Sequence, residues 1–313
     1  MPDATNVRPS RLLYATLGGG QARVLLCDTT AMAHEARRIH RASRVCTAAM
    51  GRVISAVAMM GAQLKGEKES VTLSLRGDGP AGAVVAVSRR GTVKITIDDP
   101  AVELPPRPDG KLDVGGAIGR AGRLAVVRDL GFGEPYVGQV SLVSGEVAED
   151  VAMYYTASEQ IPTLCALGVL ERQGEDDWRV AASGGLLVQA MPGCGEELLS
   201  ALELRSQLFT TLSATLEQET LEDILAQSFR GLQPDILQNI PLTLACDCSR
   251  ARIARALITL GEEELADMRA QQHGAQVHCH FCGTGYDFTA EDLTALMAQA
   301  APGPEKGREE GQS

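Results

Sequence analysis

Four cysteines near the end of the chain constrain its fold more than any other feature. They form two close pairs, Cys246 with Cys248 and Cys279 with Cys282, and a long insert separates the pairs. Two such pairs can supply four thiolates to one tetrahedral zinc ion. A one-residue gap would place the first two side chains on opposite faces of a strand, so we expect residues 246–248 to turn. The spacing predicts a bound zinc ion, and a purely architectural role for that zinc stays open.

The charge of the chain argues against a general affinity for nucleic acid. It carries 29 Lys and Arg against 40 Asp and Glu, a formal net charge of −11, whereas nucleic-acid binding depends on basic side chains that neutralise phosphate. Residues 1–17 contain no apolar core of signal-peptide length, and the longest apolar run, residues 53–60, is too short to span a bilayer. We therefore expect a cytoplasmic protein with no membrane or nucleic-acid partner, whose reduced cysteines favour metal binding over disulfides.

The other four cysteines are scattered singly among apolar or small residues: Cys27, Cys46, Cys165 and Cys194. Buried thiols of this kind behave as small hydrophobic side chains. We therefore interpret them as core residues rather than reactive groups.

Residues 1–192 contain many short strand patterns and are expected to form the core domain. Alternating or continuous apolar residues predict the strands, and glycine-containing turns separate them. The expected strands cover residues 22–27, 71–75, 83–87, 93–97, 123–128, 136–143, 163–171 and 178–190. Helices are expected over residues 31–64, with a break near Ser43, and over residues 146–155. The predicted fold class is α+β (mixed α/β): a hairpin-rich sheet domain with helices, a helical linker and a small C-terminal zinc-binding module.

The composition changes in residues 193–240, which are rich in leucine and carry eight acidic residues against two arginines. Five large apolar residues share one helical face: Leu198, Leu202, Phe209, Leu212 and Leu216. Thr220 can cap a further helix. Such helices cannot bury their apolar faces alone, so they must pack on another surface. They belong either to the core or to a detachable cover over an apolar surface, and the pattern alone favours neither.

Residues 241–300 are expected to form the zinc-binding module. Ser249 caps one helix, residues 275–288 form a hairpin that holds the second cysteine pair, and Thr289 opens a last helix with a capping box. Four arginines against eight acidic residues give this segment a net charge of −4, which counts against a DNA-binding ribbon. Residues 301–313 have nothing to bury and are expected to be a disordered tail.

Several stretches together resemble the redox-regulated 33-kilodalton heat-shock chaperone family. The most specific are CDCSR at 246–250 and CHFCG at 279–283. The first domain adds RGDGP at 76–80, YVGQVSLVSGEVAEDVAMYYTASEQIPT at 136–163 and GGLLVQAMP at 184–192. Their order and spacing also agree over nearly the whole chain, and the four cysteine positions show no departure from the family pattern.

The resemblance implies a function and a role for each cysteine. Cys246, Cys248, Cys279 and Cys282 would hold one zinc ion in the reduced, inactive protein. Oxidation would join Cys246 to Cys248 and Cys279 to Cys282 and expel the metal. The protein would then bind unfolding client proteins through its core domain as an ATP-independent holdase, and its active form would be a homodimer. The resemblance implies no enzymatic activity and no catalytic residue.

Zinc chemistry makes such a switch physically reasonable. A zinc-bound thiolate is already deprotonated, which is the form that oxidants attack. Structural zinc contributes about 10–16 kcal/mol in small zinc modules, whereas whole domains are stable by about 5–15 kcal/mol. We therefore expect the module to unfold when it loses zinc. If residues 193–240 depend on the module to stay docked, its unfolding would expose the apolar surface beneath them.

Two other classes of function are less favoured. A zinc-ribbon nucleic-acid adaptor is disfavoured by the acidic charge of the whole chain and of the module. A thiol-disulfide oxidoreductase that uses Cys279 and Cys282 would be expected beside a βαβ pattern, and none precedes this pair.

Overall fold

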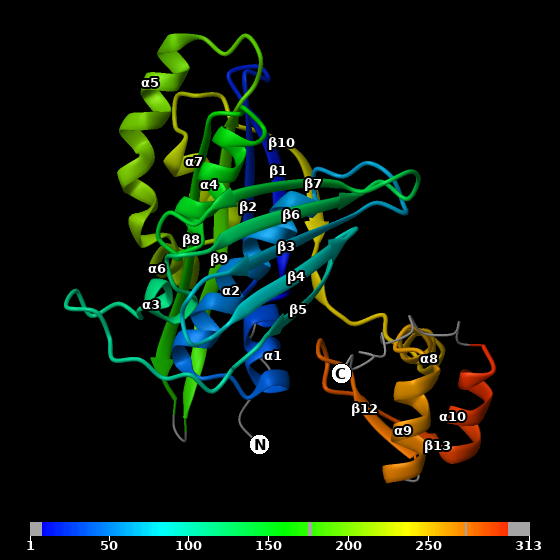
Figure 1. Ribbon diagram of the computed structural model, residues 1–313. Helices are drawn as coiled ribbons and strands as arrows, with labels where there is room; N and C mark the ends of the chain where they lie inside the picture. The colour runs from blue at the N-terminus through cyan, green and yellow to red at the C-terminus, as the bar shows by residue number, and fades with distance from the viewer. Residues whose placement is uncertain (1–7, 175–176, 273, 300–313) are drawn as a thin grey trace, which may run out of the picture. The chain divides into compact units, whose positions relative to one another are not determined.

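The computed structural model describes residues 8–174, 177–272 and 274–299 (Figure 1). The chain divides into two compact units, Met1–Ala245 and Cys246–Ser313. The second unit begins later than residue 241, the expected start of the module, because residues 241–245 contact strands of the first unit. The expected tail, residues 301–313, lies outside the described residues. Within the described ranges, every helix is too short or too polar to cross a membrane.

The first unit contains two sheets whose strands are joined mainly by hairpins (Figure 1). The strands are β1 (Arg11–Leu17), β2 (Ala22–Asp28), β3 (Ser70–Arg76), β4 (Ala83–Arg89), β5 (Thr92–Ile97), β6 (Arg123–Asp129), β7 (Tyr136–Ser141), β8 (Thr163–Gln173), β9 (Trp178–Ala190), β10 (Asp235–Pro241) and β11 (Thr243–Leu244). One sheet has the order β10-β1-β2-β9-β8 and the other the order β11-β5-β4-β3-β6-β7. All pairs of neighbouring strands are antiparallel except β11 with β5. The α+β fold class is confirmed.

Helix α2 (Arg44–Gly61) packs against strands of both sheets and forms the centre of the core. The Ser43 side chain caps it by accepting a hydrogen bond from the backbone N–H of Cys46 at 3.3 Å, at the break that the sequence predicts. All its residues except Arg44 and Arg52 are buried, which suits a helix enclosed between two sheets. Three further helices complete this part of the unit: α1 (Thr30–His40), α3 (Val114–Ile118) and α4 (Ala148–Ala157).

The other face of the five-stranded sheet is covered by the segment that follows β9 (Figure 1). This cover consists of α5 (Glu196–Arg205), the 3₁₀ helix η2 (Ser206–Thr211), α6 (Leu212–Gln218) and α7 (Leu221–Ser228). Its apolar side chains share one buried cluster with residues of β1, β2 and β9. The expectation of a helical linker over residues 193–240 needs correction at its end, because residues 235–241 form β10 and pair with β1.

The second unit contains α8 (Arg250–Ile258), α9 (Glu262–Gln272), β12 (Gly274–His278), β13 (Gly285–Thr289) and α10 (Ala290–Met297). Ser249 caps α8, and Thr289 forms a capping box with Asp292 at the start of α10. The buried core of this unit is small: Leu257, Leu265, Ala275, Phe288, Leu293 and Leu296. A core of this size gives little hydrophobic stabilisation, so the unit needs another source of stability.

Candidate metal centre

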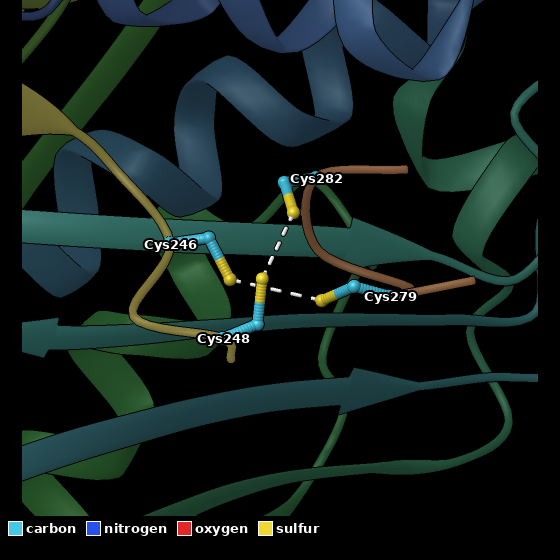
Figure 2. A group of neighbouring side chains, drawn as sticks. All are labelled: Cys246, Cys248, Cys279 and Cys282. Carbon is cyan, nitrogen blue, oxygen red and sulfur yellow. Dashed lines mark hydrogen bonds between the residues drawn. The ribbon is translucent and has the colours of Figure 1, made fainter. Parts of the chain in front are cut away.

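The two cysteine pairs come from different parts of the second unit (Figure 2). Cys246 and Cys248 lie in irregular backbone just before α8, so they are not constrained to opposite faces of a strand. Cys279 and Cys282 lie in the turn of the β12–β13 hairpin. That turn is closed by hydrogen bonds from the backbone N–H of Cys279 to the Thr284 carbonyl at 2.9 Å and from the N–H of Gly283 to the Cys279 carbonyl at 2.8 Å.

The four sulfur atoms point toward one another (Figure 2) and all lie within 4.8 Å of each other. Sγ of Cys246 is 3.7 Å from Sγ of Cys279, and Sγ of Cys248 is 3.4 Å from Sγ of Cys282. A tetrahedral zinc ion with Zn–S bonds of about 2.3 Å places its sulfur ligands about 3.8 Å apart. The four cysteines are therefore positioned to hold a metal ion, and an all-thiolate donor set is compatible with zinc.

The surroundings of the thiols also suit a cation. Burial is the largest influence on Cys246 and raises the pKa of its thiol, and the neighbouring Cys279 raises it further. A positive charge at the centre of the group would reverse this effect and favour the thiolate. For Cys282, burial is the largest single influence and acts to raise the pKa, but contacts with Thr284, Cys248 and Cys279 together lower it to about 7.

Two hydroxyl groups of the hairpin contact the cysteine sulfurs, and our reading of the sequence missed both. The Tyr286 hydroxyl donates a hydrogen bond to Sγ of Cys248 at 3.1 Å, and this bond raises the pKa of Tyr286 to about 12. The Cys282 thiol lies 3.2 Å from the Thr284 hydroxyl and donates to it. The sequence carries no local pattern for these contacts, because Cys282 and Thr284 lie in the turn before β13 and Cys248 comes from a separate segment.

Arg250 provides a second link between the two parts of the site. Its guanidinium donates to Oδ2 of Asp292 at 2.7 Å and to the carbonyl of Asp287 at 3.1 Å. It also lies over the ring of Phe288, 4.5 Å from the ring centre. These contacts join the start of α8, next to the first cysteine pair, to β13 and α10.

The remaining cysteines do not join the metal-binding group. Cys27 and Cys46 are buried, while Cys165 and Cys194 are partly buried. Burial raises the pKa of Cys27 to about 12 and also raises the pKa of Cys46 and Cys165. A thiol whose pKa is raised by burial is a poor nucleophile, which agrees with the interpretation of these three as core residues.

All five residues of the predicted apolar face are buried against the five-stranded sheet: Leu198, Leu202, Phe209, Leu212 and Leu216. Helix α6 packs on the sheet over two glycines that are cross-strand partners, Gly168 in β8 and Gly184 in β9. A Cβ atom on Gly168 would lie 2.9 Å from Cβ of Ser213, and one on Gly184 would lie 2.5 Å from Cδ1 of Leu216. The helix therefore rests on the sheet where there are no side chains.

Acidic residues of the cover also pair with arginines of the five-stranded sheet. Arg11 forms a two-pronged ion pair with Glu222 of α7, with N–O distances of 2.5 and 2.6 Å. Arg172 of β8 pairs with Glu217 of α6 at 2.9 Å. These partly exposed ion pairs fix the position of the helices more than they add stability, because each contributes about 0–1 kcal/mol.

Comparison with known proteins places this geometry in one family. A family model described as Hsp33 protein matches residues 10–289. A 33 kDa chaperonin of Acetivibrio thermocellus is 43% identical over 288 residues, which cover 91% of this chain and 96% of the relative. A 33 kDa chaperonin of Desulforamulus reducens is 40% identical over the same shares of the two chains. The crystal structure of a 33 kDa chaperonin, a heat shock protein 33 homolog from Thermotoga maritima, superposes with a TM-score of 0.84 at 35% identity, covering 93% of this chain and 99% of the other.

Proposed function

The chain belongs to the Hsp33 protein family, and from this premise we propose that it is a redox-regulated holdase that acts without ATP. A chaperone role follows from the family. The observation that carries the regulatory part is the group of four sulfurs within 4.8 Å of one another, because thiolates that hold a metal are also the groups that oxidants attack.

In the reduced protein, Cys246, Cys248, Cys279 and Cys282 would hold one zinc ion. Zinc, when bound, would neutralise the thiolates and cross-link the segment before α8 to the β12–β13 hairpin. The small core of the second unit supports this role, since a domain with so small a core needs an additional cross-link to be stable. The module would therefore be folded and the protein inactive while all four sulfurs are reduced.

Oxidation would join Cys246 to Cys248 and Cys279 to Cys282. The four sulfurs are close enough that their positions select no single pairing, and the shortest contacts run across the pairs. Sequence neighbours nevertheless close the smallest loops and lose the least chain entropy. Each disulfide would remove two ligands, so two disulfides would release the zinc and unfold the second unit.

The helices α5 to α7 would transmit this change to the client-binding surface. They pack on the five-stranded sheet through one apolar cluster, and the chain reaches the first cysteine pair from them through β10 and β11. Loss of the folded second unit would allow α5 to α7 to detach and expose the apolar faces of both helices and sheet. We further propose that unfolding proteins bind there, that the oxidised form is a homodimer, and that the protein works in the reducing cytoplasm.

An aggregation assay tests the proposal. A client that unfolds on mild heating is mixed with reduced, zinc-loaded protein or with protein oxidised by peroxide, and light scattering follows aggregation. The oxidised protein should suppress aggregation without ATP, and the reduced protein should not. Equal protection by both forms would remove the redox switch from the proposal, and protection by neither would remove the holdase function.

A further inference from the structure

Tyr286 connects the two halves of the metal centre through its hydroxyl group. Its ring is partly buried against the core of the second unit, and its backbone pairs with Val277 across the β12–β13 hairpin. The hairpin therefore fixes the position of the hydroxyl. Cys248, which accepts the hydrogen bond at 3.1 Å, comes from the separate segment before α8.

The four sulfurs are consequently not equivalent. Sγ of Cys248 accepts a hydrogen bond from the Tyr286 hydroxyl, whereas the Cys282 thiol donates one to the Thr284 hydroxyl at 3.2 Å. Cys279 has no comparable hydroxyl within the described ranges, but it is only 7% exposed. A hydroxyl that donates to a ligand sulfur draws charge from it and orients it. Such outer contacts typically change metal affinity by about 10–100-fold.

We propose that Tyr286 is a positioning residue for the metal centre, whose hydroxyl orients the thiolate of Cys248 and slows its oxidation. This inference rests on the proposed function, because it assumes that the four cysteines hold zinc and react with an oxidant. It adds to that function a side chain that sets how readily the first cysteine pair responds. The phenol keeps its proton throughout and acts through its hydrogen bond alone.

The chemistry that Tyr286 slows consumes one peroxide and two thiolates. One thiolate attacks the peroxide, the O–O bond breaks, and a sulfenic acid and a hydroxide ion form. The second thiolate attacks the sulfenic sulfur, the S–O bond breaks, and the S–S bond forms with release of a second hydroxide ion. The two sulfurs lose two electrons in total and the peroxide gains them. A hydrogen bond to a thiolate draws charge from the sulfur and makes it a weaker nucleophile, so the reaction at Cys248 is slower while Tyr286 is present.

Replacement of Tyr286 by phenylalanine tests the inference in the full chain. Tyr286→Phe keeps the ring in the core and removes the donor, so the second unit should fold around zinc as before. We expect zinc affinity, measured by competition with a chromogenic chelator, to fall about tenfold. We expect zinc release after addition of hydrogen peroxide to be several-fold faster. In cobalt-substituted protein the thiolate-to-metal charge-transfer band should shift, since the band reports charge on sulfur.

Tyr136→Phe is the matched control, because this tyrosine lies in β7 of the first unit and should leave all three readouts unchanged. Unchanged affinity, release rate and charge-transfer band in Tyr286→Phe would overturn the inference. A variant that loses zinc affinity with an unshifted band would also overturn it. The hydroxyl would then stabilise the fold of the second unit and would have no direct effect on the Cys248 thiolate. None of these measurements involves a client, so failure of the holdase assay with the expected Tyr286→Phe behaviour would count against the proposed function alone.

Discussion

Glu171 shows at the scale of single residues how the fold accommodates a carboxylate with little access to water. Its side chain is only 2% exposed, and Oε2 accepts a hydrogen bond from Nε of Arg44 at 2.8 Å. Oε1 is buried and has no hydrogen-bond partner among the described residues. The Arg44 guanidinium also lies over the Trp178 ring, 3.5 Å from its centre. Burial is the largest influence on the carboxyl group and raises the pKa of Glu171 despite the arginine.

The raised pKa predicts how the stability of the first unit depends on pH. The folded chain binds the Glu171 proton more tightly than the unfolded chain does, so stability from this group is greatest at low pH and is lost as pH rises through the folded pKa. Glu171→Gln keeps the neutral form at every pH. We expect this variant to be more stable than the parent at neutral pH in urea titrations, with the difference vanishing below about pH 4.3, the ordinary pKa of a glutamate. A variant less stable at neutral pH would mean that the Arg44 ion pair outweighs the cost of burial.

At the scale of elements, α6 depends on a flat region of the sheet. The three atoms nearest to a Cβ on Gly168 all belong to Ser213 of α6, at 2.9, 3.0 and 3.3 Å. A methyl group there would push against the helix and not against the sheet itself. Alanine also suits a strand interior better than glycine by about 0.5–1 kcal/mol. The substitution should therefore separate the stability of the sheet from the docking of its cover.

We predict that Gly168→Ala loosens α6 without releasing zinc. Hydrogen exchange should show faster exchange over residues 212–218 in the reduced protein, and the holdase assay should show partial activity before oxidation. Adding Ser213→Gly removes the two closest atoms and should restore part of the protection, with Ser213→Gly alone as the baseline. Unchanged exchange in Gly168→Ala would show that the helix can shift to accept a methyl group.

The buried face of the cover supports a second prediction on the same element. Leu202 and Phe209 are 7% and 5% exposed, and the Phe209 ring lies 5.7 Å from that of Phe229. Each large apolar side chain contributes about 1.5–3 kcal/mol when buried. Replacing both by serine should therefore detach α5 to α7 from the sheet and give a holdase active in the reduced, zinc-bound state.

Leu204 and Leu208 offer a matched control for this double variant, because they lie in the same helices but are 82% and 57% exposed. Replacing these two by serine should leave the reduced protein inactive. Activity assays and zinc analysis on both double variants decide the matter. An inactive Leu202/Phe209 variant with a protected cover would mean that other contacts hold the helices on the sheet.

Periodicity and caps in the sequence located most elements, and the strands it missed share a physical cause. β1 buries Leu12 and Leu13 in succession, on opposite faces, so its alternation is limited to the short stretch of Leu13, Ala15 and Leu17. β10 is almost wholly exposed and exists because it pairs with β1. Strands defined by a partner distant in sequence leave no local pattern. The same reason hid the Tyr286 contact, since it depends on how the hairpin meets a separate segment.

At the scale of the whole molecule, the two units differ greatly in the size of their cores. The first unit has two large clusters of buried apolar residues, and the second has one small cluster. Structural zinc contributes about 10–16 kcal/mol in small modules, which exceeds what a core of this size supplies. The stability of the second unit should therefore depend on the metal, and that of the first should not.

Removal of zinc by a strong chelator under reducing conditions tests this dependence. We predict that backbone amides of residues 246–299 lose protection from hydrogen exchange, while those of β2 and β9 keep it. Readdition of zinc should restore protection, because all four thiols are still reduced. Protection over residues 246–299 that survives complete chelation would contradict a zinc-dependent fold.

The strand order gives the cover an unusual attachment. Residues 191–234 leave the five-stranded sheet at β9 and return to it at β10, and only β1 and β2 lie between those strands. With strands about 4.8 Å apart, the two ends of the segment are held roughly 14 Å from each other. A detached cover would remain a loop fastened at both ends to the surface it has left. Its return would be an intramolecular event at an effective concentration in the millimolar range, so reclosure after reduction should be fast and independent of dilution.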